Sequence, residues 1–345
     1  MTRFLLCAAL AAAPLAALPA QQSTQQSAQQ STPPSPAPVL SASARQSVID
    51  SLARALERRY VDADTARLIA GAVRARLRAG AYDSLVAPEA FGRAVTRDLR
   101  SVNGDLHLGL RWAPDGRGSM GEGRDEAAWI AEAKARNYGI AKVEVLEGNV
   151  GYLEIRAFMG APGYEAAVVE ALRKLAGTDA VIIDLRRNGG GSGEMSHFVF
   201  SHFLGATPVE TIHVVDRGEG TARTMTSLAA VPGPRRPDVP LYLLTSGFTA
   251  SAGEEFSFVL RNQGRATLVG ERTAGAGHMV GRVPVGHGFA AGISITRVTD
   301  PRTGREWERV GVEPHLPTES AKALDAALDA ARAAIRERTA ARPAS

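Results

Sequence analysis

The chain has 345 residues, of which 45% are hydrophobic and 22% are charged, and its formal net charge is +4. This is an ordinary globular composition, and the length suits one large domain with a smaller one. Arginine and lysine are interspersed with aspartate and glutamate and form no long basic run, which argues against nucleic acid as a partner.

The first twenty residues have the layout of a secretory signal peptide. A positive start at Met1 to Arg3 is followed by an apolar run from Phe4 to Ala13 and by small residues up to Ala20. Pro14 breaks the run too early for a bilayer-spanning helix, although a retained N-terminal anchor is the alternative. We therefore expect cleavage near Ala20 and a periplasmic or secreted protein with no integral membrane span.

The only cysteine, Cys7, lies inside this segment. The processed protein would have no thiol, which excludes a cysteine nucleophile, a disulfide framework and a cysteine-ligated metal. The sequence also contains no His-Glu-x-x-His motif and no clustered His/Asp spacing. We expect neither a metal nor a cofactor.

Residues 21–40 are rich in Gln, Ser and Pro and predict a disordered linker. A helical pattern begins at Ser41. Its apolar stripe recurs every four residues, at Val48, Leu52, Leu56 and Tyr60. Further helices are expected at Thr65–Ala79 and from Pro88 onward, where proline suits the first turn. These patterns predict a small helical domain over residues 41–104.

Strands then alternate with helices. The expected strands are Leu106–Trp112, Val150–Ile155, Ala180–Leu185, Leu241–Thr245, Ala266–Val269 and Phe289–Val298, the last as an outer strand. The expected helices are Gly163–Ala176, Glu254–Asn262 and Ala321–Ala341. This alternation predicts a mixed α/β catalytic domain over residues 105–320, followed by a C-terminal helix and tail over residues 321–345.

The segment from Leu241 to Phe256 reads LYLLTSGFTASAGEEF and predicts a strand, a turn and a helix that starts near Ser251. Free N–H groups and the dipole at a helix N-terminus favour a developing oxyanion. Ser251 is therefore a candidate nucleophile, although serine is also a common helix N-cap. This segment alone does not separate the two interpretations.

The segment from Val181 to Gly191, VIIDLRRNGGG, carries an apolar strand into three glycines. Glycines there tolerate positive φ and expose N–H groups to an oxyanion or a phosphate. The segment lacks the ending of a P-loop and the spacing of a dinucleotide fingerprint. A tight strand–helix connection is the alternative interpretation.

Four motifs occur in order: DLRRNGGG at 184–191, TASAGEEF at 249–256, RATLVGERTAG at 265–275, and a segment from Asp300 to Pro314 that contains Trp307-Glu308. Together they resemble the tail-specific, or C-terminal-processing, serine peptidases over about residues 150–316. The resemblance implies a catalytic domain with the ClpP/crotonase-like β-β-α spiral. It also implies a polypeptide substrate and Ser251 as the nucleophile.

The chain departs from the bacterial processing branch of this family, whose base is a lysine. Ala276 stands where that lysine would fall, and Lys322 is the only lysine after Ser251. The other branch includes the tricorn core protease and the interphotoreceptor retinoid-binding-protein-like members, and it uses serine, histidine and glutamate. The chain is more similar to that branch.

The resemblance then implies His107, in Asp105-Leu-His-Leu-Gly109, as the base and Glu308 as the residue that orients it. In tricorn-like enzymes the glutamate acts through an intermediate serine, for which Ser101 is a candidate. His107 pointing to solvent and Glu308 as a surface charge are the alternatives. His278 is then the second candidate base.

The resemblance implies an oxyanion hole formed by the N–H of Ala252 and of a glycine, Gly189 or Gly190, of which we favour Gly190. Three other histidines are expected to be structural: His197, His202 and His213.

We therefore predict an exported serine endopeptidase of undetermined oligomeric state. One alternative is a non-catalytic module that binds peptides or hydrophobic ligands. Its pocket would be lined by apolar residues that otherwise form core, namely Phe158, Met159, Phe198, Phe200, Phe203 and Leu204. Another alternative is an esterase that uses the same serine.

Overall fold

The computed structural model describes residues 39–113 and 126–341. The expected signal peptide, nearly all of the expected linker and the end of the tail lie outside these residues. No helix among the described residues is both long enough and apolar enough to cross a membrane.

Three helices open the described chain: α1 (Ala42–Arg59), α2 (Ala63–Arg78) and α3 (Pro88–Asn103). The expected stripe of α1 is fully buried. Side chains cap two of the helices, because the Ser41 hydroxyl accepts from the Ala44 N–H and Asp62 accepts from the Thr65 N–H. Gly104 ends α3 in the left-handed region. The three predicted helices are confirmed.

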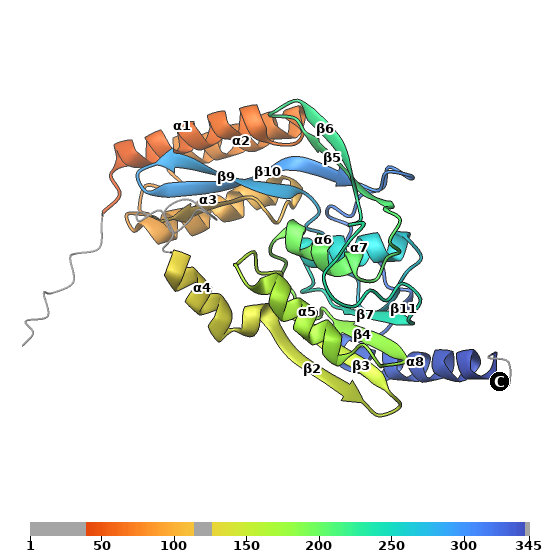
Figure 1. Cartoon of the computed structure of the whole chain (residues 1–345). Coiled ribbons are helices and arrows are strands. Elements are labelled where there is room, and N and C mark those ends of the chain that lie inside the picture. The colour runs from red at the N-terminus through yellow and green to blue at the C-terminus, as the bar shows by residue number, and fades with distance from the viewer. Residues whose placement is uncertain (1–38, 114–125, 342–345) are drawn as a thin grey trace, which may run out of the picture. The chain divides into compact units, whose positions relative to one another are not determined.

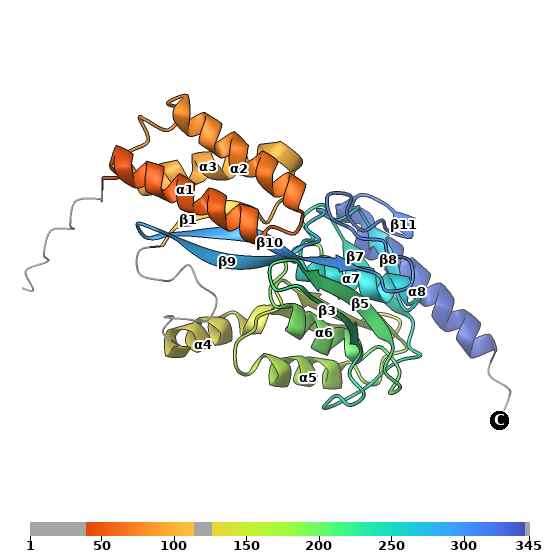
Figure 2. The ribbon, with the colours of Figure 1, turned by 90° about the horizontal axis from the view of Figure 1, so that it is seen from above.

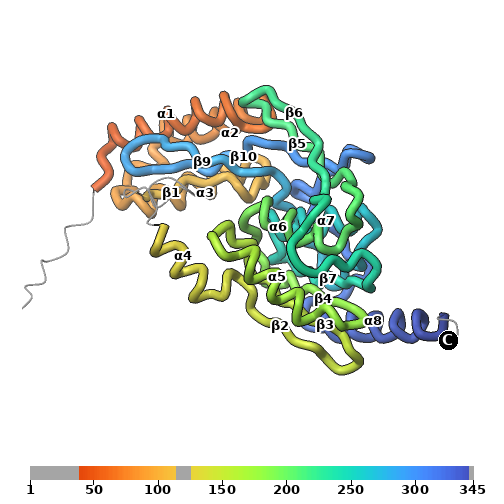
Figure 3. The backbone as a smooth tube through the Cα atoms, in the orientation of Figure 1, coloured from red at the N-terminus to blue at the C-terminus, as the bar shows by residue number. Residues whose placement is uncertain are grey.

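These helices lie against a five-stranded sheet, as Figure 2 shows. Its strands run in the order β1 (Gly109–Trp112), β10 (Phe289–Thr299), β5 (Glu210–Asp216) and β6 (Thr221–Thr226), with β9 (Met279–Gly286) also paired to β10. Leu108 and Leu110 share one apolar core with the helices, together with Phe289, Ala291 and Ile293. The N-terminal helices are thus packed on strands that come from both ends of the chain (Figure 3).

β10 is not an outer strand, contrary to the prediction. It pairs with β1 over Phe289–Gly292, with β9 over Phe289–Thr296 and with β5 over Thr296–Thr299. Apolar and polar residues alternate along β10, as they do in a half-exposed edge strand. In this strand the alternation arises because one face of β10 packs against the N-terminal helices.

A second sheet has six strands. Its order is β11 (Leu316–Pro317), β8 (Thr267–Gly270), β7 (Leu241–Thr245), β4 (Ala180–Asp184), β3 (Val150–Ile155) and β2 (Ile140–Leu146). All neighbours are parallel except β2 and β3. The predicted strands at β3, β4, β7 and β8 are confirmed.

Helices cover both faces of this sheet (Figure 1). On one face lie α5 (Tyr164–Lys174), α6 (Gly193–Ser201) and α7 (Ala252–Asn262), and on the other lies α8 (Ala323–Ala340), whose Ala323, Ala327 and Ala331 pack on the strands. The remaining elements are α4 (Glu126–Ala135) and two short 3₁₀ turns, Asn137–Gly139 and Ser320–Lys322. The carboxyl ends of β4 and β7 meet at one edge, where ligands bind in sheets of this kind.

The proposed aromatic ligand pocket is core instead. Phe158, Phe198, Phe200, Phe203 and Leu204 are buried in the cluster under α6 and α7, and Met159 packs against it. Phe158 and Phe256 stack with ring centroids 5.5 Å apart. A buried, interdigitated cluster offers no room for a ligand, so the core interpretation is confirmed.

Candidate active site

Ser251 occupies the sharp turn between β7 and α7, directly before the first residue of the helix. Its φ of 54° and ψ of −122° lie in a region that L-residues avoid. Such a conformation costs about 1–3 kcal/mol and persists only where the surroundings enforce it. The turn therefore places Ser251 beyond the end of β7 and directly at the N-terminus of α7.

Glu254, three residues further on, enforces this turn. Its buried carboxylate accepts the Ser251 N–H at 2.9 Å and the Ala276 N–H at 2.7 Å on one oxygen. The other oxygen accepts the Thr273 hydroxyl at 2.5 Å and the Gly275 N–H at 2.6 Å. Burial raises the pKa of Glu254, and these hydrogen bonds oppose that effect. One carboxylate therefore ties Ser251 to the loop at 273–276.

The structure places the glycine run at 189–191 against Ser251. A Cβ on Gly190 would lie 2.7 Å from the Ser251 Cβ, so only glycine fits there. The Gly190 N–H, however, donates to the Asn188 side-chain oxygen at 2.8 Å. The Gly190 N–H thus already has a partner, and our preference for Gly190 as the oxyanion donor stays a prediction.

Two other N–H groups near Ser251 are free. Within the described ranges, neither the Ala252 N–H nor the Gly189 N–H donates a hydrogen bond. Ala252 is the first residue of α7, where the N–H groups have no intrahelical acceptor. Ala252 and Gly189 are thus the pair available to an oxyanion.

His107 contributes the side chain that reaches Ser251. Its Nε2 lies 3.2 Å from the Ser251 Oγ, although 144 positions separate the two residues. Burial lowers the pKa of His107, and electrostatic interactions with His278 and Arg100 lower it further, whereas Asp105 opposes this effect. The imidazole is therefore neutral at pH 7 and can accept a proton.

Asp105 positions the His107 backbone, a role that we did not assign from the sequence. Its Oδ1 accepts the His107 N–H at 2.9 Å, and its Oδ2 accepts the Tyr60 hydroxyl at 2.9 Å. Burial alone would raise the pKa of Asp105. The interactions with His278, Ser294, the His107 N–H and Tyr60 outweigh burial and lower it to about 2. The only sequence signal was its position two residues before His107.

Glu308 lies in the same region but forms no hydrogen bond with His107 among the described residues. Its Oε2 accepts the Gly277 N–H at 2.7 Å and the His278 N–H at 3.0 Å. Its Oε1 is buried without a partner, as is the Nδ1 of His107. Burial raises the pKa of Glu308, and the charge of His278 opposes this. Glu308 is buried rather than a surface charge.

His278, the second candidate base, faces the carboxylates instead of the serine. Its Nδ1 lies 3.8 Å from Asp105 Oδ2 and 3.7 Å from Glu308 Oε2. No hydrogen bond to Ser251 is formed by this ring, whose two nitrogens lack partners within the described chain. His107 is thus the histidine that the fold brings to the nucleophile.

Asp105, His278 and Glu308 also have the donor types of a metal site, with ligand atoms within 4.8 Å of one another. Two backbone N–H groups already use both lone pairs of Glu308 Oε2, and Tyr60 uses one of Asp105 Oδ2. Glu308 Oε2 is thus committed to the protein, whereas Glu308 Oε1 and both nitrogens of His278 have no hydrogen-bond partner among the described residues. We interpret the group as a charge cluster that holds the loop at 275–278.

Other candidates lie elsewhere. The Ser101 hydroxyl donates to the Asp98 carbonyl on an exposed part of α3, so this structure gives it no bridging role between His107 and Glu308. Lys322 is exposed and pairs with Glu319. Three histidines bond to neighbouring chain segments, as expected of structural residues: His197 to the Thr226 carbonyl, His202 to the Pro234 carbonyl and His213 to the Thr224 hydroxyl.

Comparison with known proteins defines the class. Residues 149–318 match the model of peptidase family S41. The carboxyl-terminal-processing protease of Synechocystis sp. is 30% identical over 168 residues, which are 48% of this chain and 37% of that protein. The carboxy-terminal-processing protease of Bartonella bacilliformis is 27% identical over 195 residues, 55% of this chain and 42% of that protein. The chain thus matches less than half the length of these relatives.

Solved structures share the fold at low identity. Mature CPAF complexed with lactacystin has a TM-score of 0.59 at 13% identity, over 86% of this chain and 98% of that one. The tricorn protease has a TM-score of 0.53 at 14% identity, over 85% of this chain and 37% of that one. The fold is accordingly mixed α/β, with N-terminal helices and a ClpP/crotonase-like catalytic domain.

Residues 149–318, just under half of the chain, are therefore similar to peptidase family S41, and carboxyl-terminal-processing proteases are among the relatives of the chain.

Proposed function

We propose that the chain is an exported serine endopeptidase that hydrolyses peptide bonds in polypeptides, with Ser251 as nucleophile and His107 as base. The observation that carries this proposal is the 3.2 Å separation of His107 Nε2 and Ser251 Oγ at the start of α7. A nucleophile and base within hydrogen-bond reach are the signature of covalent acyl transfer. Export rests on the signal-peptide pattern of residues 1–20.

In the first half of the reaction, the Ser251 Oγ forms a bond to the peptide carbonyl carbon while its proton passes to His107 Nε2. The carbonyl oxygen becomes an oxyanion and accepts hydrogen bonds from the N–H groups of Ala252 and Gly189. When the C–N bond breaks, the leaving amine takes the proton from His107. The acyl group stays on Ser251 and the C-terminal product departs.

In the second half, a water molecule gives a proton to His107 as its oxygen bonds to the acyl carbon. Collapse of that intermediate breaks the bond to the Ser251 Oγ, which recovers its proton from His107. The oxyanion donors act in both halves, because the same oxygen carries the charge in each.

Glu308 acts as a positioning residue. It accepts two N–H groups of the loop at 277–278, next to Asp105, which holds the His107 backbone. The negative cluster stabilises the imidazolium that forms when His107 takes the proton. This role needs no direct contact between Glu308 and His107.

Hydrolysis of casein by the wild type and by Ser251→Ala tests the proposal. Ser257→Ala is the matched control, since Ser257 lies on the same helix and its hydroxyl only bonds the Gly253 carbonyl. We expect activity in the wild type and the control, and a loss of at least about 10³-fold in Ser251→Ala. Full activity in Ser251→Ala would overturn the proposal. Parallel assays on ester substrates distinguish a peptidase from an esterase.

A further inference from the structure

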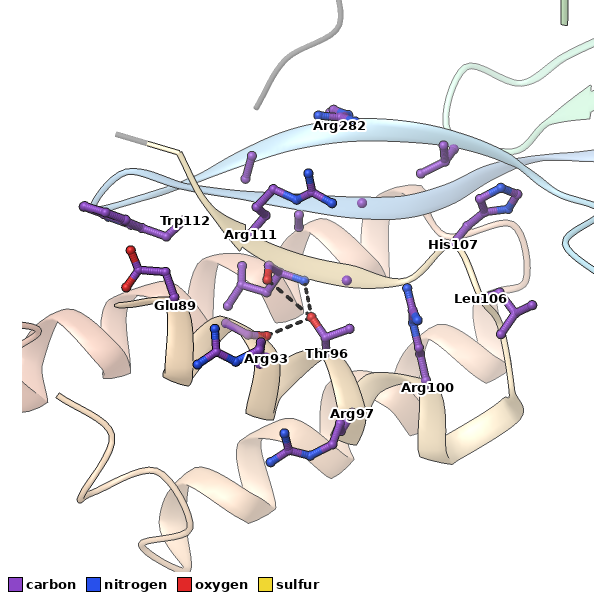
Figure 4. A pocket seen from close by; sticks show the side chains of 17 residues that line it. Glu89, Arg93, Thr96, Arg97, Arg100, Leu106, His107, Arg111, Trp112 and Arg282 are labelled. Atoms are coloured by element: carbon purple, nitrogen blue, oxygen red, sulfur yellow. Dashed lines mark hydrogen bonds between the residues drawn. The ribbon is translucent and has the colours of Figure 1, made fainter. Parts of the chain in front are cut away.

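A pocket of about 690 Å³ opens beside the catalytic histidine. It lies along α3, β1 and the β9–β10 hairpin, with His107 at one end and Glu89 and Trp112 at the other (Figure 4). The pocket is strongly basic. Against the single acid, Glu89, it is lined by five arginines: Arg93, Arg97, Arg100, Arg111 and Arg282.

Strand geometry brings two of these arginines to the side of His107. Arg111 lies on β1, which begins two residues after His107, and both residues line the pocket. Arg282 on β9 pairs with Gly292 on β10, and Gly292 pairs with Gly109 on β1. Directly opposite residues point to the same side of a sheet. The two glycines therefore add no side chain of their own between Arg282 and β1.

The five arginines have no acidic partners within the part of the chain that the structure describes. Arginines elsewhere in the chain do form ion pairs, such as Arg76 with Asp98 and Arg272 with Glu313. Burial lowers the pKa of Arg282, and the charge of Arg111 lowers it further, which indicates that the two guanidinium groups repel each other. Uncompensated repulsion of this kind is relieved when an anion binds.

The position of His107 indicates which part of a substrate reaches this pocket. His107 delivers the proton to the leaving amine, so the chain on the C-terminal side of the scissile bond departs past His107. An extended peptide advances about 3.3 Å per residue. The first few residues after the scissile bond therefore extend along the face that carries Arg111 and Arg282.

We propose that this pocket binds substrate carboxylates on the C-terminal side of the scissile bond, with Arg111 and Arg282 as the specificity-determining residues. Guanidinium groups bind carboxylates through paired hydrogen bonds, which suit aspartate and glutamate side chains or a terminal carboxylate. This inference rests on the proposed peptidase function, because that function sets the direction of the substrate.

The test uses four matched peptides that share one cleavage site. They carry either Glu or Gln at the three positions after the scissile bond, and they end in either a free acid or an amide. We expect the wild type to cleave a carboxylate-bearing peptide with a kcat/KM about 10–100-fold above that of the Gln amide peptide. The preference should shrink as salt is added. The Glu/Gln and acid/amide pairs identify which carboxylate is bound.

The variant Arg111→Gln/Arg282→Gln should reduce this preference to within about 3-fold while it still cleaves the Gln amide peptide. Arg223→Gln, an exposed arginine on β6 outside the pocket, is the matched control and should keep the wild-type preference. Equal cleavage of all four peptides by the wild type, or a preference that survives in the double variant, would overturn the inference.

Binding of the same peptides to Ser251→Ala, measured by fluorescence anisotropy, separates this inference from the proposed function. Tighter binding of carboxylate peptides that Arg111→Gln/Arg282→Gln abolishes supports the pocket, whether or not the wild type hydrolyses them. Equal binding of all four peptides counts against the pocket even if Ser251 proves to be the nucleophile.

Discussion

The two sides of the site are built differently. On the nucleophile side, Glu254 accepts four hydrogen bonds and every one of its oxygens is used. On the base side, His107 Nδ1, both nitrogens of His278 and Glu308 Oε1 are buried without partners among the described residues. A fully bonded network is rigid, whereas buried groups without partners can rearrange. Ser251 is thus held in place before substrate arrives, and the side that carries His107 is the part that can adjust.

The largest effect should come from removal of the base. His107→Ala deletes the proton acceptor of Ser251, and general base catalysis of this kind contributes about 10²–10⁴-fold to kcat. The measurement is kcat on a peptide substrate, with thermal melting to check the fold. His213→Ala, whose ring only bonds Thr224, is the control and should keep its activity. Unchanged kcat in His107→Ala would show that another group is the base.

Glu254→Gln should disrupt the hydrogen-bond network around Ser251 and lower the Tm of the protein. The amide nitrogen would face two N–H groups, or an N–H and a hydroxyl, in place of an acceptor. Unsatisfied buried donors of this kind cost roughly 2–4 kcal/mol, or a Tm lower by about 5–15 °C. Differential scanning fluorimetry measures this shift. Glu194→Gln, at the exposed start of α6, is the control, and an equal Tm for both variants would contradict the comparison.

Glu308→Gln should have a smaller effect. Glutamine keeps an oxygen for the Gly277 and His278 N–H groups, so the loop stays in place and only the charge is lost. We expect kcat to fall about 10–100-fold with KM and Tm little changed. Glu313→Gln, an exposed glutamate that pairs with Arg272, is the control. A large loss of Tm with normal kcat would assign Glu308 a purely structural role.

The smallest effect concerns pH. Because burial lowers the pKa of His107, the acid limb of kcat/KM should have its midpoint below 6.5. Activity is then complete at neutral pH and is lost as the pH falls and His107 becomes protonated. The Arg100 charge adds to the lowering, so Arg100→Gln should move the midpoint to higher pH. If the acid limb of the wild-type kcat/KM profile had its midpoint above pH 6.5, the conclusion that burial lowers the pKa of His107 would be contradicted.

Local patterns made the nucleophile side predictable. The apolar strand, the small residues and the helix around Ser251 are contiguous, and the spacing of Ser251 and Glu254 is that of a capping box. The expectation for Gly190 did not account for Asn188, which accepts its N–H, because hydrogen-bond partners are not visible in a glycine run.

The base side depends on contacts between distant segments. His107 follows α3 but reaches Ser251 only because β1 pairs with β10, which the sequence placed at an edge. The roles of Tyr60 and Asp105 likewise depend on the packing of α1 against these strands. The family resemblance identified His107 and Glu308 as candidates. That the two side chains form no hydrogen bond with each other could be learned only from the fold.

Reaction of Ser251 with a fluorophosphonate tests the central claim most directly, since it needs no knowledge of the substrate. The account predicts one label per chain, on Ser251 by peptide mapping, and a labelling rate that falls by about 10²-fold or more in His107→Ala. A label on another residue, no label on the folded wild type, or an unchanged rate in His107→Ala would contradict it.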